Sequence, residues 1–314
     1  MRRRLMLPLL VIAAVAIAPA SASGASYVVG IGEQNAAVFD QPLFQQSGVK
    51  RVRYLVPWDW NRVDGIRAET DGYVGRALAE GKDVFVTFTA KRGCWARGRY
   101  SKAKRCKAPT VKAYKRSVKQ FRKRFPGVRT FAPWNEANHA SQPTAKKPRL
   151  AARYYNAMRK VCKGCRLVAL DILDQSDAVR YLKKFRRKAK GSPKRWGLHN
   201  YSDVNRRRVR DTRRILKQAP GELWLTETGG IVSFGRSFPY SEQRAKNRTK
   251  YMFRLANRFQ KRRKGMRSRI TRIYPYSWYG YERGARFDAG LVNPDGSARP
   301  ALTVFLNRAK KARR

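Results

Sequence analysis

The stretch LWLTETGG, at residues 223–230, has the form of a buried strand that ends in a carboxylate. Three apolar residues and a threonine lead to Glu227, and polar, turn-forming residues follow at once. The stretch WNEANH, at residues 134–139, has the same form around Glu136. Surface glutamates or helix N-caps are the alternative interpretation, but a charged group at the end of a core strand is costly and needs a reason. We therefore expect both glutamates to lie at one rim of a sheet.

Eight apolar, strand-like runs recur along the chain, with stretches of helical character between them. The clearest helical stretch spaces its apolar residues by 3 or 4 positions from Val111 to Phe125, which forms one stripe on a helix. The eight runs cover residues 27–31, 49–56, 83–89, 128–134, 166–173, 196–201, 222–227 and 270–278. Strand followed by helix, eight times over, is the pattern of an α/β fold of the (β/α)8 TIM barrel type. Residues 26–314 are predicted to form this single barrel domain.

Loop lengths support the same fold. The turns from helix back to strand are short, and five of them carry a glycine, at positions 48, 81, 127, 164 and 221. The segments after the third, fourth, seventh and eighth runs are long and irregular. In a barrel these long loops lie at the carboxyl ends of the strands, where active sites are built. Glu136 and Glu227 both open onto that face.

The first 25 residues are typical of a secretory signal peptide. Three arginines precede a short apolar run, and small residues offer cleavage after Ala22 or Ala25. The apolar run is short for a membrane span, and an uncleaved anchor is the alternative. We expect an exported protein, extracellular or associated with the cell wall, that has no membrane span once the signal is removed.

The chain is extremely basic, with 72 Lys and Arg against 20 Asp and Glu and a net charge of +52. Removing three arginines and no acid with the signal peptide leaves +49. This charge favours electrostatic association with anionic cell-wall or extracellular polymers. The basic residues are spread over many predicted helix faces, so a nucleic-acid site is disfavoured. A monomer is expected.

Four cysteines fit export. Cys94 and Cys106 bracket one basic loop, and Cys162 and Cys165 bracket two residues. Three pairings are possible, and short loop closure favours the local one. A redox or zinc motif is the alternative for the second pair, but it lacks a second pair of ligands. Two structural disulfides are predicted.

The two glutamate motifs resemble the catalytic signatures of glycoside hydrolase clan A, the retaining (β/α)8 glycosidases, with families five and thirty-nine the nearest. In that clan an Asn-Glu pair ends the fourth strand, and here it is Asn135 and Glu136. The resemblance implies that Glu136 is the general acid/base and Glu227, ending the seventh strand, the nucleophile. Double displacement by two carboxylates would cleave O-glycosidic bonds of a poly- or oligosaccharide. It also implies that Asn135 hydrogen-bonds a sugar hydroxyl.

Four further residues match clan positions that bind the substrate or hold the nucleophile. The resemblance implies that Arg53 holds the nucleophile carboxylate and that His199 and Tyr201 contact the nucleophile and the sugar. It implies that Trp278 forms the aromatic floor of the sugar site. The alternative for Arg53 is one more arginine in a very basic chain, that for His199 and Tyr201 is a satisfied buried polar pair, and that for Trp278 is ordinary packing. Some clan families carry a histidine at the end of the third strand, whereas this run ends Thr-Phe-Thr at residues 87–89.

Other chemistries find little support in the sequence. There is no G-x-S-x-G elbow, no P-loop and no complete dinucleotide fingerprint. Glu136 and His139 have the Glu-x-x-His spacing of di-iron sites, but a second copy is missing. No cofactor and no metal are expected. The alternative to an enzyme is a non-catalytic barrel that binds anionic glycans or cell-wall polymers.

Overall fold

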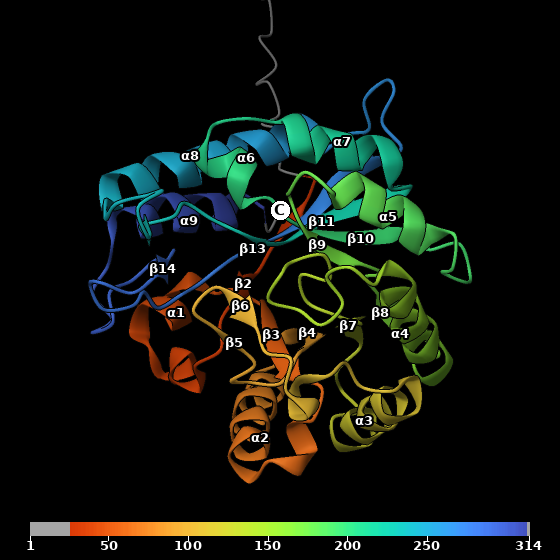
Figure 1. The fold of residues 1–314 in the computed structure, drawn as a ribbon. Helices are drawn as coiled ribbons and strands as arrows, with labels where there is room; N and C mark the ends of the chain where they lie inside the picture. Colours follow the sequence, from red (N-terminus) through yellow and green to blue (C-terminus); the bar gives the residue numbers. More distant parts are fainter. Residues whose placement is uncertain (1–25, 313–314) are drawn as a thin grey trace, which may run out of the picture.

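Short parallel strands form the inner layer of the molecule (Figure 1). The computed structural model describes residues 26–312, and the predicted signal peptide, residues 1–25, lies outside the described residues. The strands are β1 (Val28–Val29), β2 (Ile31–Gly32), β3 (Arg51–Pro57), β4 (Asp83–Thr89), β5 (Trp95–Ala96), β6 (Arg99–Tyr100), β7 (Thr130–Ala132), β8 (Arg166–Leu167), β9 (Asp171–Leu173), β10 (Arg195–His199), β11 (Gly221–Thr228), β12 (Ser233–Phe234), β13 (Ser268–Pro275) and β14 (Phe287–Asp288).

Two five-stranded parallel sheets make up the barrel, in the orders β1-β13-β11-β10-β9 and β2-β3-β4-β7-β8. β1 and β2 are two halves of one extended segment, and so are β8 and β9. Each segment changes partner midway: Gly30 N donates to Ile273 O at 2.8 Å, while Glu33 N donates to Arg53 O at 3.2 Å. Likewise, Val168 N bonds β7 and Ala169 N bonds β10. The two divided segments join the sheets, and the predicted eight-stranded (β/α)8 barrel is confirmed.

Glycine is required at the first change of partner. A Cβ on Gly30 would lie 2.6 Å from the Tyr274 ring and 2.8 Å from the Arg51 carbonyl oxygen. Both distances are far below van der Waals contact, so the backbone can approach its neighbours there only without a side chain.

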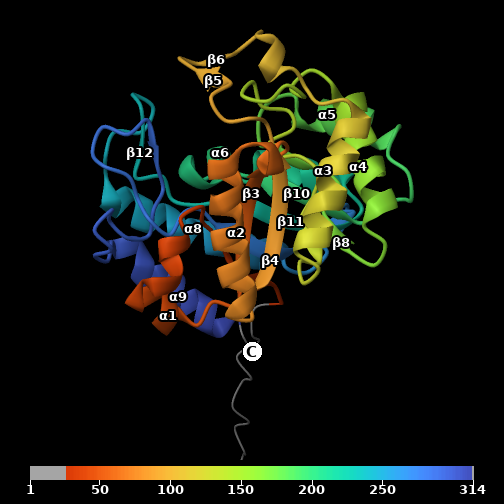
Figure 2. The ribbon, with the colours of Figure 1, turned by 90° about the horizontal axis from the view of Figure 1, so that it is seen from below.

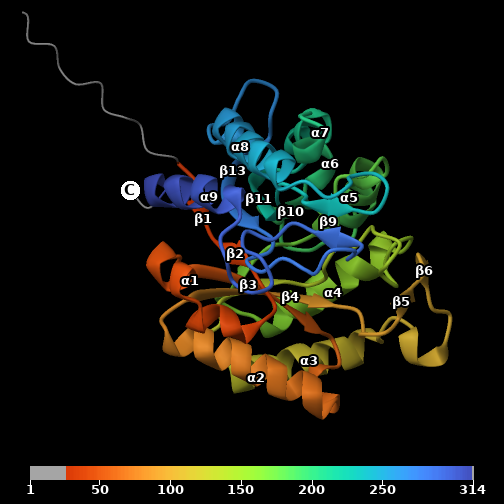
Figure 3. The ribbon, with the colours of Figure 1, turned by 90° about the vertical axis from the view of Figure 1, so that its left-hand side faces the viewer.

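Helices cover the outside of the barrel, and α7 and α8 lie on the side opposite α2 and α3 (Figure 1 and Figure 3). The predicted stripe of α3 packs inward through Tyr114, Val118 and Phe121. The helices are α1 (Pro42–Ser47), α2 (Asp64–Ala79), α3 (Val111–Arg124), α4 (Pro148–Val161), α5 (Ala178–Arg186), α6 (Tyr201–Asn205), α7 (Arg210–Gln218), α8 (Glu242–Phe259) and α9 (Pro300–Lys311), with 3-10 turns η1 (Ala36–Asp40), η2 (Trp60–Arg62) and η3 (Lys104–Cys106).

An aromatic layer fills the barrel interior and carries the polar groups above it. Phe85, Trp224 and Tyr274 are buried in one cluster, with the Phe85 ring edge-on to Trp224 at 5.7 Å. The guanidinium of Arg53 lies over the Phe85 ring at 5.8 Å. The interior thus changes from apolar to charged within one layer of side chains, which gives the charged layer a rigid base.

Both predicted disulfides are present, Cys94–Cys106 and Cys162–Cys165, and the described residues hold no free cysteine. The first closes the loop that contains the β5–β6 hairpin, which stands away from the barrel at the top of Figure 2. The second ties the end of α4 to the start of β8. Within residues 26–312, none of the helices is long and apolar enough to cross a membrane.

Candidate active site

Glu136 follows β7, and backbone hydrogen bonds hold the chain on both sides of it. Asn135 N donates to Phe88 O of β4 at 2.7 Å, and Ala137 N donates to Asp171 O of β9 at 2.8 Å. Glu136 itself has a φ of 41°. This left-handed conformation is strained for a residue with a side chain and is common at functional sites. The neighbouring strands therefore determine where the carboxylate points.

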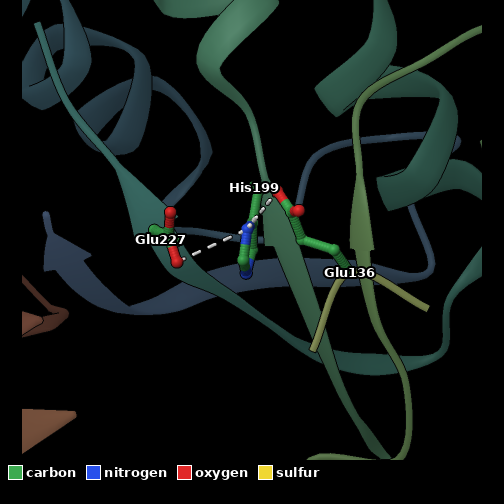
Figure 4. A group of neighbouring side chains, drawn as sticks. All are labelled: Glu136, His199 and Glu227. Atoms are coloured by element: carbon green, nitrogen blue, oxygen red, sulfur yellow. Dashed lines mark hydrogen bonds and ion pairs between the residues drawn. The ribbon is translucent and has the colours of Figure 1, made fainter. Parts of the chain in front are cut away.

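Glu227 lies near the end of β11, beside His199 of β10 in the ladder. Glu136, His199 and Glu227 each present a side-chain nitrogen or oxygen within 4.8 Å of the other two. Figure 4 shows the histidine ring between the two carboxyl groups. The structure thus brings the two motif glutamates together at one rim of the barrel.

Arg53 of β3 organises the acidic groups from below. Its Nη1 donates to Glu227 Oε2 at 2.8 Å, and its Nη2 donates to Asn135 Oδ1 at 2.7 Å and Asp171 Oδ2 at 3.0 Å. The arginine is completely buried. A planar guanidinium can serve several acceptors in fixed directions, which a lysine cannot. The predicted contact between Arg53 and Glu227 is confirmed.

Tyr201, the first residue of α6, holds the other oxygen of Glu227. Its hydroxyl donates to Glu227 Oε1 at 3.2 Å, as predicted. Burial raises the pKa of Tyr201 well above its ordinary value, and the charge of Glu227 raises it further. The phenol therefore stays protonated and remains a donor. Arg53 donates to one oxygen of Glu227 and Tyr201 to the other, so the direction of the carboxylate is fixed.

His199 is a buried cation among three carboxylates. Its Nδ1 lies 3.2 Å from Glu136 Oε1 and 3.7 Å from Glu227 Oε2, and its Nε2 lies 3.1 Å from Asp171 Oδ1. Burial alone would lower the pKa of His199, but the charges of Asp171 and Glu227 outweigh it and raise the pKa to about 10. Both ring nitrogens therefore carry a proton at neutral pH.

The contact with His199 has the opposite effect on the pKa of Glu136, which it lowers. Burial raises the pKa of Glu136, but the hydrogen bond and charge of His199 outweigh burial and bring the pKa below its ordinary value. A general acid needs a raised pKa. Because the two groups share a hydrogen bond, Glu136 and His199 titrate as a pair that holds one proton near neutral pH.

A cavity of about 470 Å³ opens above the two glutamates. Its walls are largely aromatic and apolar, with Asn135, Glu136 and Glu227 at its base. The lining also includes Leu55, Trp95, His139, Leu173, Asp174, Tyr201, Ser202, Arg206, Ile231, Phe234, Phe238, Tyr276, Arg286 and Phe287. This combination of apolar walls and a few convergent polar groups is typical of a small-molecule site.

The prediction that Trp278 forms the floor of the sugar site is wrong. Trp278 is fully buried and packs edge-on against Phe44 of α1 at 5.1 Å and Phe305 of α9 at 6.3 Å. β13 ends at Pro275, and Tyr276, directly after it, lines the cavity instead. The chain turns outward beyond Tyr276, so Trp278 packs behind the barrel wall.

His199, predicted to contact the sugar as well as the nucleophile, lies below the cavity, and so does Arg53, which was grouped with the substrate-binding residues. Both are completely buried, and neither lines the cavity. They lie beneath the carboxylates and position them. Of the residues predicted to contact sugar, Asn135 and Tyr201 do reach the cavity wall.

Asp171 and Glu33 are two of the buried carboxylates whose positions the sequence did not predict. Asp171 accepts bonds from Arg53 and from the hydroxyl of Thr226 and lies beside His199. Burial raises its pKa, but the charges of His199 and Arg53 prevail and bring it to about 2. Glu33 accepts four backbone N–H groups, among them those of Trp278 and Tyr279 at 3.0 Å, and so ties the first strand to the loop after the last. The sequence feature that could have indicated Glu33 is a single acidic residue directly after a strand-like run.

The cluster of Glu136, His199 and Glu227 has the donor atoms for a metal ion. However, His199 is protonated at neutral pH, with both ring nitrogens facing carboxylates. A metal would have to displace that proton in the presence of the Arg53 charge. The arrangement therefore fits a site that holds a proton better than one that binds a cation.

A (β/α)8 barrel with two facing carboxyl groups at the carboxyl ends of its strands is the architecture of a glycosidase. The chain belongs to the glycosyl hydrolase catalytic core family, whose profile matches residues 106–305. The protein is therefore a glycoside hydrolase, and its substrate is a carbohydrate. No curated protein matches the chain.

Solved glycosidase structures share the fold. A GH5_18 enzyme from Streptomyces cattleya, in complex with GlcNAc, superposes with a TM-score of 0.64 at 12% identity, covering 93% of this chain and 81% of that one. Xylanase XynB from Paenibacillus barcinonensis gives 0.63 at 12% identity, covering 90% and 95%. Xylanase 10B from Thermotoga maritima gives 0.56 at 12% identity, covering 91% and 95%. The predicted kinship with the clan A barrel glycosidases is confirmed.

Proposed function

We propose that the protein cleaves O-glycosidic bonds with retention of anomeric configuration, with Glu227 as nucleophile and Glu136 as acid/base. The observation that carries this proposal is the proximity of the two carboxyl groups, with an oxygen of each within 4.8 Å of the other. Retaining enzymes hold their carboxyls about 5–5.5 Å apart, whereas inverting enzymes need roughly 6.5–9.5 Å to admit a water.

The two glutamates have surroundings suited to different roles. Arg53 and Tyr201 each donate a hydrogen bond to Glu227 and fix the direction of its carboxylate. Its carboxylate oxygen attacks the anomeric carbon, and the bond from that carbon to the leaving oxygen breaks. Glu136 passes to the leaving oxygen the proton that it shares with His199. Water then attacks the glycosyl-enzyme ester while Glu136 takes the proton of the water, which releases the sugar and restores both carboxyl groups.

His199 supplies the link between the two carboxyls. Its hydrogen bond to Glu136 lets the pair hold the proton that the first step consumes. When Glu227 loses its charge by forming the ester, His199 loses one of the anions that stabilise its own proton. Loss of the Glu227 charge also removes a nearby anion that disfavours the ionised form of Glu136, so Glu136 can stay ionised and act as base in the second step.

The fold neighbours suggest the type of linkage. One structure contains Manb1-4GlcNAc, and another is an endo-beta-1,4-xylanase. We infer that this chain also acts on a β-linked glycan. Aryl β-glycosides and β-linked polysaccharides are therefore the first substrates to screen.

Two substitutions test the assigned roles. Glu227→Ala is expected to abolish turnover, and azide should restore part of it and yield a glycosyl azide of inverted configuration. Glu136→Ala is expected to spare the first step, seen as a burst of released phenol, on aryl glycosides whose leaving group needs no proton, and to slow the second step on every substrate. Glu69→Ala is the matched control, because Glu69 is half exposed and pairs with Arg92 outside the cavity. Wild-type rates on every substrate for both cavity variants would refute the roles.

We also propose that the protein is exported and associates with an anionic surface. The basic, apolar and small-residue pattern of residues 1–25 supports secretion. Two disulfides support an oxidising compartment. A mature charge of +49 after loss of residues 1–25 supports association with an anionic wall or extracellular polymer. N-terminal sequencing of protein recovered from culture medium should begin at Ser23 or Ser26, and an intact Met1 would contradict export by cleavage.

A further inference from the structure

One wall of the active-site cavity is built from the loops after β11 and β13. β12 and β14 pair there, with Phe234 opposite Phe287 and their rings 5.9 Å apart. Phe238 joins them through backbone bonds to Phe234. All three rings line the cavity. Aromatic faces of this kind suit the apolar face of a sugar ring.

Two arginines stand among these rings. Arg206, directly after α6, lies over the Phe238 ring at 5.4 Å. Arg286 directly precedes Phe287, and its carbonyl accepts a bond from Gly235 N at 3.1 Å. Both line the cavity and are exposed to it. Within residues 26–312, no carboxylate lies within 4.0 Å of either guanidinium.

This wall is in contact with the reacting groups. The Phe287 ring meets the Tyr201 ring edge-on at 5.4 Å. The Tyr201 hydroxyl is bonded to Glu227 at 3.2 Å. A sugar positioned for attack by Glu227 therefore lies against the wall that carries Arg286 and Arg206.

Besides the two reacting glutamates, the cavity has little negative charge to neutralise these arginines. Apart from Glu136 and Glu227, its lining contains one carboxyl group, that of Asp174. Asp174 accepts bonds from Ser202 N at 3.2 Å and Asp203 N at 2.8 Å. Burial raises the pKa of Asp174 to about 8, and the charge of Asp203 adds to the increase. At neutral pH, Asp174 therefore adds little negative charge.

We propose that Arg206 and Arg286 bind an anionic group, a carboxylate or a sulfate ester, on the sugar in the active-site cavity. The proposal rests on the proposed function, because it places that sugar at Glu227. A guanidinium offers paired donors to two oxygens of such a group, and the bonds are stronger than those to a neutral hydroxyl. The substrate class is accordingly an acidic glycan, built with uronic acid or sulfated sugars.

An adjacent groove extends the same chemistry. It has a volume of about 920 Å³ and is lined by Lys102, Lys107, Lys146 and Lys147. Asn138 lines this groove, and the next residue, His139, lines the active-site cavity. Within the described residues, the one acid that lines the groove is Asp177, which accepts bonds from Asn138 and Gln175. Further charged units of a polyanionic chain could lie along this groove.

Matched substrates test the proposal. Aryl β-glycosides are compared as sets that differ only at C6: hydroxymethyl, carboxylate or sulfate ester. We expect the charged members to have a kcat/KM about 10- to 100-fold above the neutral one, the range for hydrogen bonds to a charged group. The R206Q/R286Q double variant should reduce this ratio to about one. The carboxylate and sulfate arms tell the two anions apart.

The matched control is R213Q/R254Q, which removes the same charge from exposed arginines outside the cavity, one of them over a tyrosine ring as Arg206 is over Phe238. It should keep the wild-type ratio. A preference for neutral sugars, or an anion preference that survives in R206Q/R286Q, would overturn the proposal.

Calorimetry separates this proposal from the proposed function. Binding of an oligouronate or sulfated oligosaccharide that disappears in R206Q/R286Q, in a protein without turnover, would support the arginine site and contradict the catalytic assignment. Turnover of neutral glycosides alone, with no binding of the charged oligosaccharides, would do the reverse.

Discussion

Replacement of Arg53 by methionine is expected to destabilise the protein and to stop catalysis. Arg53 is completely buried and pairs with Asp171 at 3.0 Å and Glu227 at 2.8 Å. Removing one partner of a buried ion pair leaves an uncompensated charge and typically costs about 3–5 kcal/mol. The pKa of Asp171 gives an independent scale: its drop from 3.8 to about 2 corresponds to roughly 2–3 kcal/mol, to which Arg53 and His199 both contribute.

The control lies two residues earlier on the same strand. Arg51 pairs with Asp83 at 3.7 Å, with both side chains about one third exposed. Arg51→Met should therefore cost at most about 1 kcal/mol. Urea denaturation at neutral pH measures both variants, and kcat on an aryl glycoside should fall only for Arg53→Met, because Glu227 loses its strongest partner.

A double variant tests whether the loss of stability in Arg53→Met comes from uncompensated buried charge. Asp171→Asn in the Arg53→Met background removes one of the stranded anions, so the combined loss of stability should be smaller than the sum of the single losses by about 0.5–3 kcal/mol. Activity should not return, because Glu227 remains without its arginine. The reasoning is refuted if Arg53→Met is as stable and active as wild type, or if the losses simply add.

Four further outcomes are expected. The raised pKa of His199, from 6.5 to about 10, means that its stabilising effect is complete below pH 6.5 and is lost as pH rises toward 10; urea midpoints should show this decline, and His199→Gln should flatten it. Mutating the Cys94–Cys106 pair, 12 residues apart, to alanine should cost about 3 kcal/mol by loop-closure entropy, and thiol titration of unfolded, unreduced wild type should find no free thiol. Tyr276→Ala should lower kcat/KM, whereas Trp278→Ala should chiefly lower stability, by about 3–5 kcal/mol in calorimetry. Raising salt should release the protein from anionic polymer yet barely change turnover of a neutral aryl glycoside, and a parallel collapse of both would contradict surface tethering.

The parts of the fold that sequence could predict are those encoded locally. Apolar runs predicted the strand segments, and short loop closure predicted both disulfides. The division of two segments into β1/β2 and β8/β9 was not predictable, because it depends on which neighbour each backbone group bonds. An apolar pattern reports burial and carries no information about that choice.

The site shows the same limit. Glu136 and Glu227 could be predicted from the sequence, because each is an acidic residue at the end of a buried apolar run. Asp171 does not, because it lies within the apolar run 166–173, and its partners Arg53 and Thr226 are 118 and 55 residues away. Trp278 was misassigned because the resemblance placed it by its position in the eighth run, whereas β13 ends at Pro275 and the chain has left the barrel wall before Trp278.

The scarcity of acid in this chain makes the position of each carboxylate informative. The chain has 72 basic residues and only 20 acidic ones. An acidic side chain on the surface would therefore find basic partners almost anywhere, and nothing about solubility requires it to be buried. Within residues 26–312, eight of the acids are nevertheless buried; among them, Glu33, Asp174 and Glu227 lie at or directly after the ends of barrel strands, and Asp171 lies within β9. Burial of a carboxylate is costly unless it is bonded, and each of these four accepts hydrogen bonds from named donors. The basic exterior and the buried acids are therefore separate features: in the proposed function, the first attracts a polyanion over a distance, and the second acts by contact on the bond to be cleaved. Arg206 and Arg286 are where the two meet, because they extend the positive charge of the surface into the cavity above Glu227.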